Sequence, residues 1–204
     1  MKLFIAVLSA AWVLAGCNTR ITKTAETQGS AQTSKSSILD DPKVRYEILT
    51  VAIDGEKLQR HSGDSSSALH YAPHMQTPYT GWVKHMHANG QVWGLGHYLD
   101  GKLDGQLTLW RENGQKLREV HFKDGEKDGL WTLWYENGQK KEEGHYNGGK
   151  KDGLWISWQE NGRKWIEQNL KDGQREGATI YYNKYGTEDF RETYKDGIRV
   201  KDMD

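Results

Sequence analysis

The chain has 204 residues, with 28 Lys and Arg against 28 Asp and Glu, so its formal net charge is zero. Nucleic-acid binding draws most of its affinity from neutralised phosphates, so a chain without basic excess predicts no nucleic-acid partner. Only 35% of the residues are hydrophobic, yet there are 9 Trp, 10 Tyr and 23 Gly beside 3 Pro. Disordered chains are poor in aromatic residues, so this composition favours short strands joined by tight turns.

The N-terminus has the form of a secretory signal. Lys2 precedes an almost wholly apolar run from Leu3 to Val13, which is too short for a membrane span. The run ends in Leu14-Ala15-Gly16-Cys17, which resembles the lipoprotein box of bacteria. That resemblance implies a signal peptide over residues 1–16, acylation of Cys17 with palmitate or a similar chain, and a membrane anchor at the cell envelope. Asn18 in place of Asp favours the outer membrane, if the cell has two.

Cys17 is the single cysteine, which excludes an intramolecular disulfide and weakens the alternative of an ordinary buried cysteine. Residues 17–40 are then the lipidated cysteine and a flexible linker rich in Thr, Ser and Gln. Residues 41–80 fit no repeat. Because Val44, Tyr46 and Ile48 alternate and Asp54-Gly55 is a candidate turn, we expect a capping hairpin and a loop there.

Residues 81–204 contain five units of 24 residues, which begin at Gly81, Gly105, Gly129, Gly153 and Gly177. One slot holds Asn-Gly in four units, from Asn89-Gly90 to Asn161-Gly162, and a second slot holds Asp-Gly or Gly-Gly. Because a type I′ turn needs positive φ at both central residues, we predict a tight two-residue turn at Asn-Gly and a looser turn at the second slot. The sequence therefore predicts an all-β repeat array of antiparallel hairpins.

Counting outward from the Asn-Gly turn assigns side chains to two faces, because they alternate along a strand. The first face, which we expect to be the core, collects Trp131, Trp155, Leu109, Leu133, Tyr98, Phe122, Tyr146, Leu170 and Tyr194. The second face carries a candidate binding stripe of Met86, Trp110, Trp134, Trp158 and Tyr182, with Trp93, Leu117 and Trp165 beside it. The stripe is either cross-strand packing or an exposed aromatic surface that binds a partner.

The pattern G-x-W-x-x-W-x-x-N-G, followed by a tyrosine and a second glycine turn, resembles the variant MORN repeat of bacteria from Gly81 to about Val200. The resemblance implies a twisted sheet of successive hairpins in which each unit contacts its neighbours. Many proteins of this family carry the name of antitoxin-like components of toxin–antitoxin systems. For an exported chain, that implies protection by occluding a toxin in the envelope.

The sequence gives little support for a metal site or for a catalytic site. His97, His121 and His145 share one slot, so their backbones lie about 9.6 Å apart, too far to share a zinc ion easily. His85 and His87, with His61, His70 or His74, are a weaker metal candidate. Turn chemistry accounts for the calcium-like segment from Asp124 to Gly129. With no nucleophile constellation and no phosphate loop, we expect neither an enzyme nor a cofactor.

The leading hypothesis is a lipid-anchored envelope protein whose repeats bind an unknown protein partner, in an antitoxin-like or a scaffolding role. The alternative is cell-wall or glycan binding through the aromatic stripe, although adjacent aromatic pairs of the kind that glycan-binding repeats carry, such as Tyr181-Tyr182, are few. The balanced charge argues against membrane binding by the repeats themselves. A homodimer is a further option, because a hairpin array has unpaired edge strands.

Overall fold

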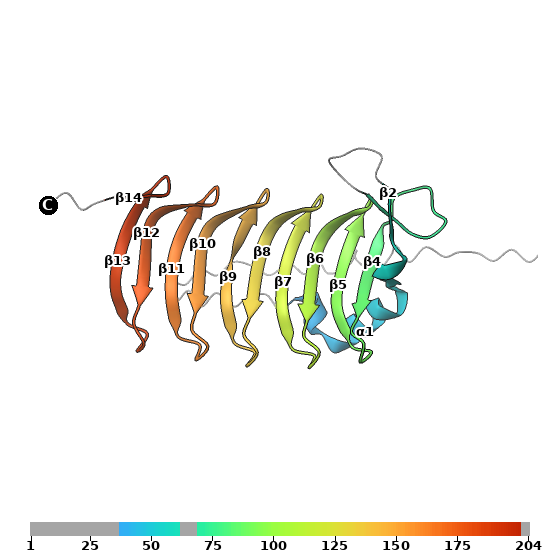
Figure 1. Ribbon diagram of the computed structural model, residues 1–204, viewed down its shortest axis with the longest axis horizontal. Coiled ribbons are helices and arrows are strands. Elements are labelled where there is room, and N and C mark those ends of the chain that lie inside the picture. The colour runs from blue at the N-terminus through green and yellow to red at the C-terminus, as the bar shows by residue number, and fades with distance from the viewer. Residues whose placement is uncertain (1–36, 62–68, 201–204) are drawn as a thin grey trace, which may run out of the picture. The chain divides into compact units, whose positions relative to one another are not determined.

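The computed structural model describes residues 37–61 and 69–200, which belong to one compact unit (Figure 1). The predicted signal peptide, Cys17 and most of the predicted linker lie outside the described residues. The described chain is mostly β, and it contains one sheet of twelve strands and a second sheet of two strands. The prediction of an all-β array of sequential hairpins is therefore confirmed.

The large sheet follows the chain order, as β1-β4-β5 and onward to β14 (Figure 1). The short β1 pairs in parallel with β4, and all the other pairs are antiparallel. The strands after β3 are β4 (Gly81–Met86), β5 (Val92–Leu99), β6 (Lys102–Trp110), β7 (Lys116–Lys123), β8 (Glu126–Trp134), β9 (Lys140–Asn147), β10 (Lys150–Trp158), β11 (Lys164–Lys171), β12 (Gln174–Tyr182), β13 (Glu188–Lys195) and β14 (Ile198–Val200).

The segment before the repeats differs from the predicted capping hairpin. It forms η1 (Ile38–Asp40), α1 (Pro42–Val51), β1 (Ile53–Asp54), η2 (Gly55–Lys57), β2 (Gln59–His61) and β3 (Leu69–Tyr71). The strand predicted around Tyr46 is therefore wrong, and Gly55 begins a 3₁₀ turn rather than a hairpin turn. The Asp41 carboxylate accepts hydrogen bonds from the backbone N–H of Lys43 and Val44, and Pro42 follows it, so a capped helix begins here.

The two turn slots have the opposite geometry to the prediction. At the second slot both residues have positive φ, 47° at Asp100 and 80° at Gly101, so the type I′ turns lie there. At Asn89-Gly90 only the glycine has positive φ. A three-residue loop is closed by hydrogen bonds from the Gly90 N–H to the His87 carbonyl oxygen and from the His87 N–H to the Gln91 carbonyl oxygen. Asn-Gly therefore marks a loop with a glycine bulge.

This bulge preserves the predicted register over most of each hairpin. His85 pairs with Gly94, as a two-residue turn would also require, because the longer loop and the extra bulge residue compensate each other. Only the pair nearest the loop changes. Trp110 pairs with Lys116 rather than Leu117, and Trp158 pairs with Lys164 rather than Trp165.

The core on the first face is confirmed for the middle of the array. Val120, Trp131, Trp155 and Leu170 are buried together, and Phe122, Leu133 and Tyr146 pack against them. Trp131 and Trp155 lie 5.4 Å apart between ring centroids. Gly144 provides the space for Trp155, because a Cβ at Gly144 would overlap the indole ring. Tyr98 at one end of this face instead contacts His70 edge to face.

Candidate functional site

The second face of the large sheet is called here the ladder face, and it carries Met86, Trp110, Trp134, Trp158 and Tyr182. The N-terminal segment covers one end of this face, at β4–β7 (Figure 1). Leu39 is fully buried and Trp110 is 5% exposed, in a cluster with Ala52 and Leu95. Part of the predicted stripe is therefore core, under the helix that the sequence did not predict.

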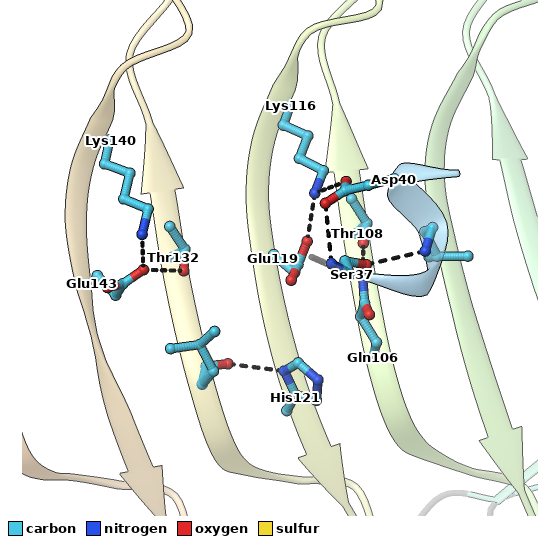
Figure 2. A network of polar contacts seen from close by, with 12 residues as sticks. Ser37, Asp40, Gln106, Thr108, Lys116, Glu119, His121, Thr132, Lys140 and Glu143 are labelled. Carbon is cyan, nitrogen blue, oxygen red and sulfur yellow. Dashed lines mark hydrogen bonds and ion pairs between the residues drawn. The ribbon is translucent and has the colours of Figure 1, made fainter. Parts of the chain in front are cut away.

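Polar contacts hold the segment on the ladder face (Figure 2). The Gln106 side chain donates hydrogen bonds to the hydroxyl oxygens of Ser37 and Thr108. Lys116 forms ion pairs with Asp40 and with Glu119, the latter at 2.8 Å. The segment is thus anchored through side chains that occupy repeat positions.

The other end of the helix has a similar anchor. Lys84 donates a hydrogen bond of 2.8 Å to the Leu49 carbonyl oxygen in the last turn of α1. The Arg45 guanidinium lies 5.7 Å from the centroid of the Trp110 ring. A cation at a helix C-terminus and a cation over an indole face are both favourable arrangements.

The same lysine–glutamate pair recurs along the ladder face. Lys140 lies 2.5 Å from Glu143, and Lys164 lies 2.6 Å from Glu167. The exposed fraction of the lysine side chain rises from 20% at Lys116 to 33% at Lys140 and 43% at Lys164. This increase follows the distance from the N-terminal segment. The hydrogen bond that the Lys164 ammonium donates to the Glu167 carboxylate raises the pKa of Lys164.

Aromatic and aliphatic side chains complete the open part of the ladder face. Lys116 lies 5.3 Å from the Trp134 ring centroid, and Lys164 lies 5.7 Å from that of Tyr182. On β10, Leu154, Ile156 and Trp158 alternate with buried Trp155, so they share the ladder face, and Leu154 is exposed. Beyond β7 the face therefore offers apolar side chains flanked by charged pairs.

Trp93 and Trp165 do not pair across the strands with Met86 and Trp158, as a two-residue turn would require, although Trp165 still lines a hollow together with Trp158. Both are the extra residue of the bulge after the hairpin loop. Trp93 stacks on His85 at 4.6 Å between ring centroids. Trp165 is 52% exposed. The stripe residue pairs instead with the residue one position before the bulge residue, which is a lysine opposite Trp110, Trp134 and Trp158. The predicted two-residue turn did not give this pairing.

Two adjoining hollows lie near the Asn-Gly loops of the middle units. One has a volume of about 330 Å³ and the other about 150 Å³, and Tyr135 and Lys141 line both. Trp134 lines the first, while Trp158 and Trp165 line the second. The Tyr135 hydroxyl donates a hydrogen bond of 2.9 Å to the Trp158 carbonyl oxygen, which joins neighbouring hairpins. Sequence reasoning missed Tyr135, because that slot holds a different residue type in each unit.

The repeat histidines contact backbone carbonyl oxygens. The Nδ1 atoms of His97 and His121 lie 3.2 and 3.3 Å from the carbonyl oxygens of Asp104 and Leu130. In the described part of the chain, no three His, Cys, Asp or Glu side chains gather as a group that could hold a metal ion. Within residues 37–61 and 69–200, no helix has the length and apolar composition needed to cross a bilayer.

Comparison with known families identifies the hairpins. Residues 103–124 and 127–147 match the model of the MORN repeat variant, and these two segments coincide with the hairpins β6–β7 and β8–β9. Over these two hairpins the chain is similar to the MORN repeat variant. The match confirms, for these two segments, the resemblance predicted from the spacing of Trp, Asn-Gly and Tyr. MORN repeats generally mediate protein–protein or membrane interactions. No curated protein matches the chain.

Proposed function

We propose that this chain is a lipid-anchored protein of the bacterial envelope whose MORN variant repeats bind another protein through the ladder face. The observation that carries the proposal is the partial cover of that face. The N-terminal segment buries Trp110, while Trp134, Trp158 and Tyr182 stay half-buried and accessible from one side. Exposed aromatic surfaces rimmed by charge are typical of interaction sites.

Anchoring is the second part of the proposal, and it rests on the sequence. Cys17 would be acylated, and Asn18 favours the outer membrane of a cell that has two membranes. A lipid anchor holds a chain at the surface of a membrane without a membrane span. The repeats would then meet partners in the envelope, and they would act by binding alone, without catalysis or a cofactor.

The narrower form of the proposal is an antitoxin-like role. An array that occupies a toxin's working surface would block the toxin without any chemistry of its own. The family resemblance supports this form, and a scaffolding role has the same structural requirements. The identity of the partner separates the two roles.

The proposal is tested by affinity capture from envelope extract with the full chain as bait. One variant carries Trp134→Ala and Trp158→Ala on the ladder face, and the matched control carries Trp93→Ala and Tyr185→Ala, at two exposed aromatic residues that line neither hollow. Circular dichroism first confirms that both variants fold. We expect a stoichiometric envelope protein that the first variant loses and the control retains. Capture of no protein, or equal capture by both variants, would contradict the proposal.

Glycan binding is the second candidate function, and the two hollows at Tyr135 favour it. Aromatic rings beside Lys141, Glu136 and Glu160 combine stacking surfaces with hydrogen-bonding groups, which is how binding pockets fix an orientation. Retention of the full chain on isolated cell wall, lost in Trp165→Ala and kept in Trp93→Ala, would establish this function instead. No retention on cell wall would eliminate it.

A further inference from the structure

The N-terminal segment shows what kind of chain the ladder face accepts. A carboxylate, Asp40, precedes the helix and pairs with a repeat lysine, Lys116. Leu39 beside it is fully buried, and the apolar side of α1, with Ile48 and Leu49, packs against the cluster of Leu95 and Trp110. The bound element is thus an amphipathic helix with an acidic residue before its first turn.

The positions that hold this helix recur one unit further along the sheet. Lys140 replaces Lys116 and Glu143 replaces Glu119, each at the same repeat slot (Figure 2). In the same way, Trp134 replaces Trp110. Lys116 pairs with two carboxylates, whereas in the described part of the chain Lys140 pairs with Glu143 alone. An ammonium group has three donors, so Lys140 retains capacity for a second carboxylate.

The spacing of the repeats suits a second helix at this place. Two strands occupy about 9.6 Å across a sheet, and an α-helix with its side chains is about 10–12 Å wide. One further helix therefore fits beside α1 over each additional unit. The open unit also offers apolar side chains for such a helix, since Leu154 is exposed and Ile156 and Trp158 are half-buried.

We propose that the ladder face over β8–β11 binds an amphipathic helix of a partner protein, with an Asp or Glu before its first turn paired to Lys140. This inference rests on the proposed function and names the class of partner. This surface is continuous with the contact between α1 and the sheet, and among the described residues Lys140 has room for a second carboxylate. A charge-assisted hydrogen bond of this kind fixes the register of the bound helix.

A synthetic peptide of residues 37–52 carries the required chemistry and serves as the probe, with the full chain as the receptor. Binding is followed by fluorescence anisotropy of the labelled peptide. Lys140→Glu in the receptor, or Asp40→Lys in the peptide, is expected to raise the Kd at least about tenfold, or about 1.4 kcal/mol. The matched control is Lys123→Glu, because Lys123 is exposed at the end of β7 and lines neither hollow.

The charge swap separates a direct pair from loss of folding. The Asp40→Lys peptide is expected to regain affinity for the Lys140→Glu receptor, which an unfolded receptor cannot show. If Lys140→Glu leaves the Kd of the peptide unchanged, the peptide either displaces the chain's own α1 or binds elsewhere. That result would overturn the proposal. Absence of binding at about 1 mM peptide would also overturn it.

These outcomes are independent of the test of the proposed function. An envelope protein captured through Trp134 and Trp158, without peptide binding, would overturn the helix proposal and leave the proposed function standing. Peptide binding at Lys140, without any captured envelope protein, would support the helix proposal while the proposed function fails. If the captured partner is a second copy of this chain, the helix proposal is overturned, because the one α-helix in its described residues already packs against its own sheet.

Discussion

At the scale of single residues, glycines and their large neighbours determine the packing of the array. Gly144 lies opposite Trp131 in the sheet, and a Cβ there would overlap the ring of Trp155, which is almost fully buried. Gly94 lies on the corresponding strand two units earlier, where a Cβ would meet Leu109 at 3.4 Å, an ordinary contact. Glycine is therefore required at position 144, whereas a larger residue can replace it at position 94.

The prediction is that Gly144→Ala lowers the free energy of unfolding by about 1–3 kcal/mol, because overpacking a rigid core forces side chains from their rotamers. Gly94→Ala is the control, and we expect a change within about 0.5 kcal/mol. Urea unfolding followed by tryptophan fluorescence measures both. Equal stabilities of the two variants would contradict the assignment of Trp155 to the space above Gly144.

A second residue-scale prediction concerns His85, which lies between Gly55 and the Trp93 ring. Burial lowers the pKa of His85 below its ordinary 6.5, although Asp54 and Glu56 oppose this shift. Because the folded state binds the proton less tightly than the unfolded state, the stability from this group is present above pH 6.5 and is lost as the pH falls through the folded-state pKa.

We therefore expect the wild-type chain to lose more stability than His85→Phe between about pH 7 and about pH 5. The phenyl ring keeps the stack on Trp93 and cannot take up a proton in this range. Urea midpoints at the two pH values provide the measurement. An identical loss in both proteins would show that His85 contributes nothing to the pH dependence.

At the scale of elements, the hairpins were predictable and the helix was not. The 24-residue spacing of turn residues defines the strands, and the glycine bulge leaves most of the register where a two-residue turn would place it. The sequence does not reveal the bulge, because Asn-Gly is compatible both with a two-residue turn and with a three-residue loop that has a glycine bulge. The lysines that pair with the stripe were therefore not predicted. Val44 and Ile48 are four residues apart, and this spacing places two side chains on the same side of either a helix or a strand. The sequence alone does not decide between them. In the folded chain, Leu39 and Ile48 pack against the sheet in the helical arrangement.

The element-scale prediction tests how the N-terminal segment is seated. Leu39→Ala should lower the free energy of unfolding by about 2–4 kcal/mol, because Leu39 is fully buried against the sheet. The emission of Trp110 should also shift to longer wavelength as water reaches its ring. Ile38→Ala, at an exposed neighbour, is the matched control and should do neither. Equal behaviour of the two variants would mean that α1 is not held on the ladder face.

At the scale of the whole molecule, the proposal combines an anchor at one end of the chain with an array of repeats in the rest. Each hairpin pairs with the next one, so the same side-chain positions recur at regular intervals along the described sheet. Within the described residues, the N-terminal segment contacts the slots of the first units and leaves those of the later units open. A partner can therefore be held by the same side chains that hold the chain's own helix.

The anchor provides a prediction at this scale. Cys17→Ser should release the chain from the membrane fraction, because the thiol that would carry the acyl chain is absent. In a source cell with two membranes, Asn18→Asp should leave the chain membrane-bound and move it from the outer to the inner membrane. Fractionation and immunoblotting measure both. A Cys17→Ser chain that still sediments with the membrane would contradict lipid anchoring.

Hydroxyl-radical footprinting of the full chain, purified and in its own cells, tests whether a partner binds through the ladder face. In the purified chain, Trp110 should resist oxidation, while Trp134, Trp158 and the exposed Trp93 are modified. In the cells, the account predicts protection of Trp134 and Trp158 by the partner, with Trp93 unchanged. Equal oxidation of Trp134 and Trp158 in both settings would contradict binding through the ladder face.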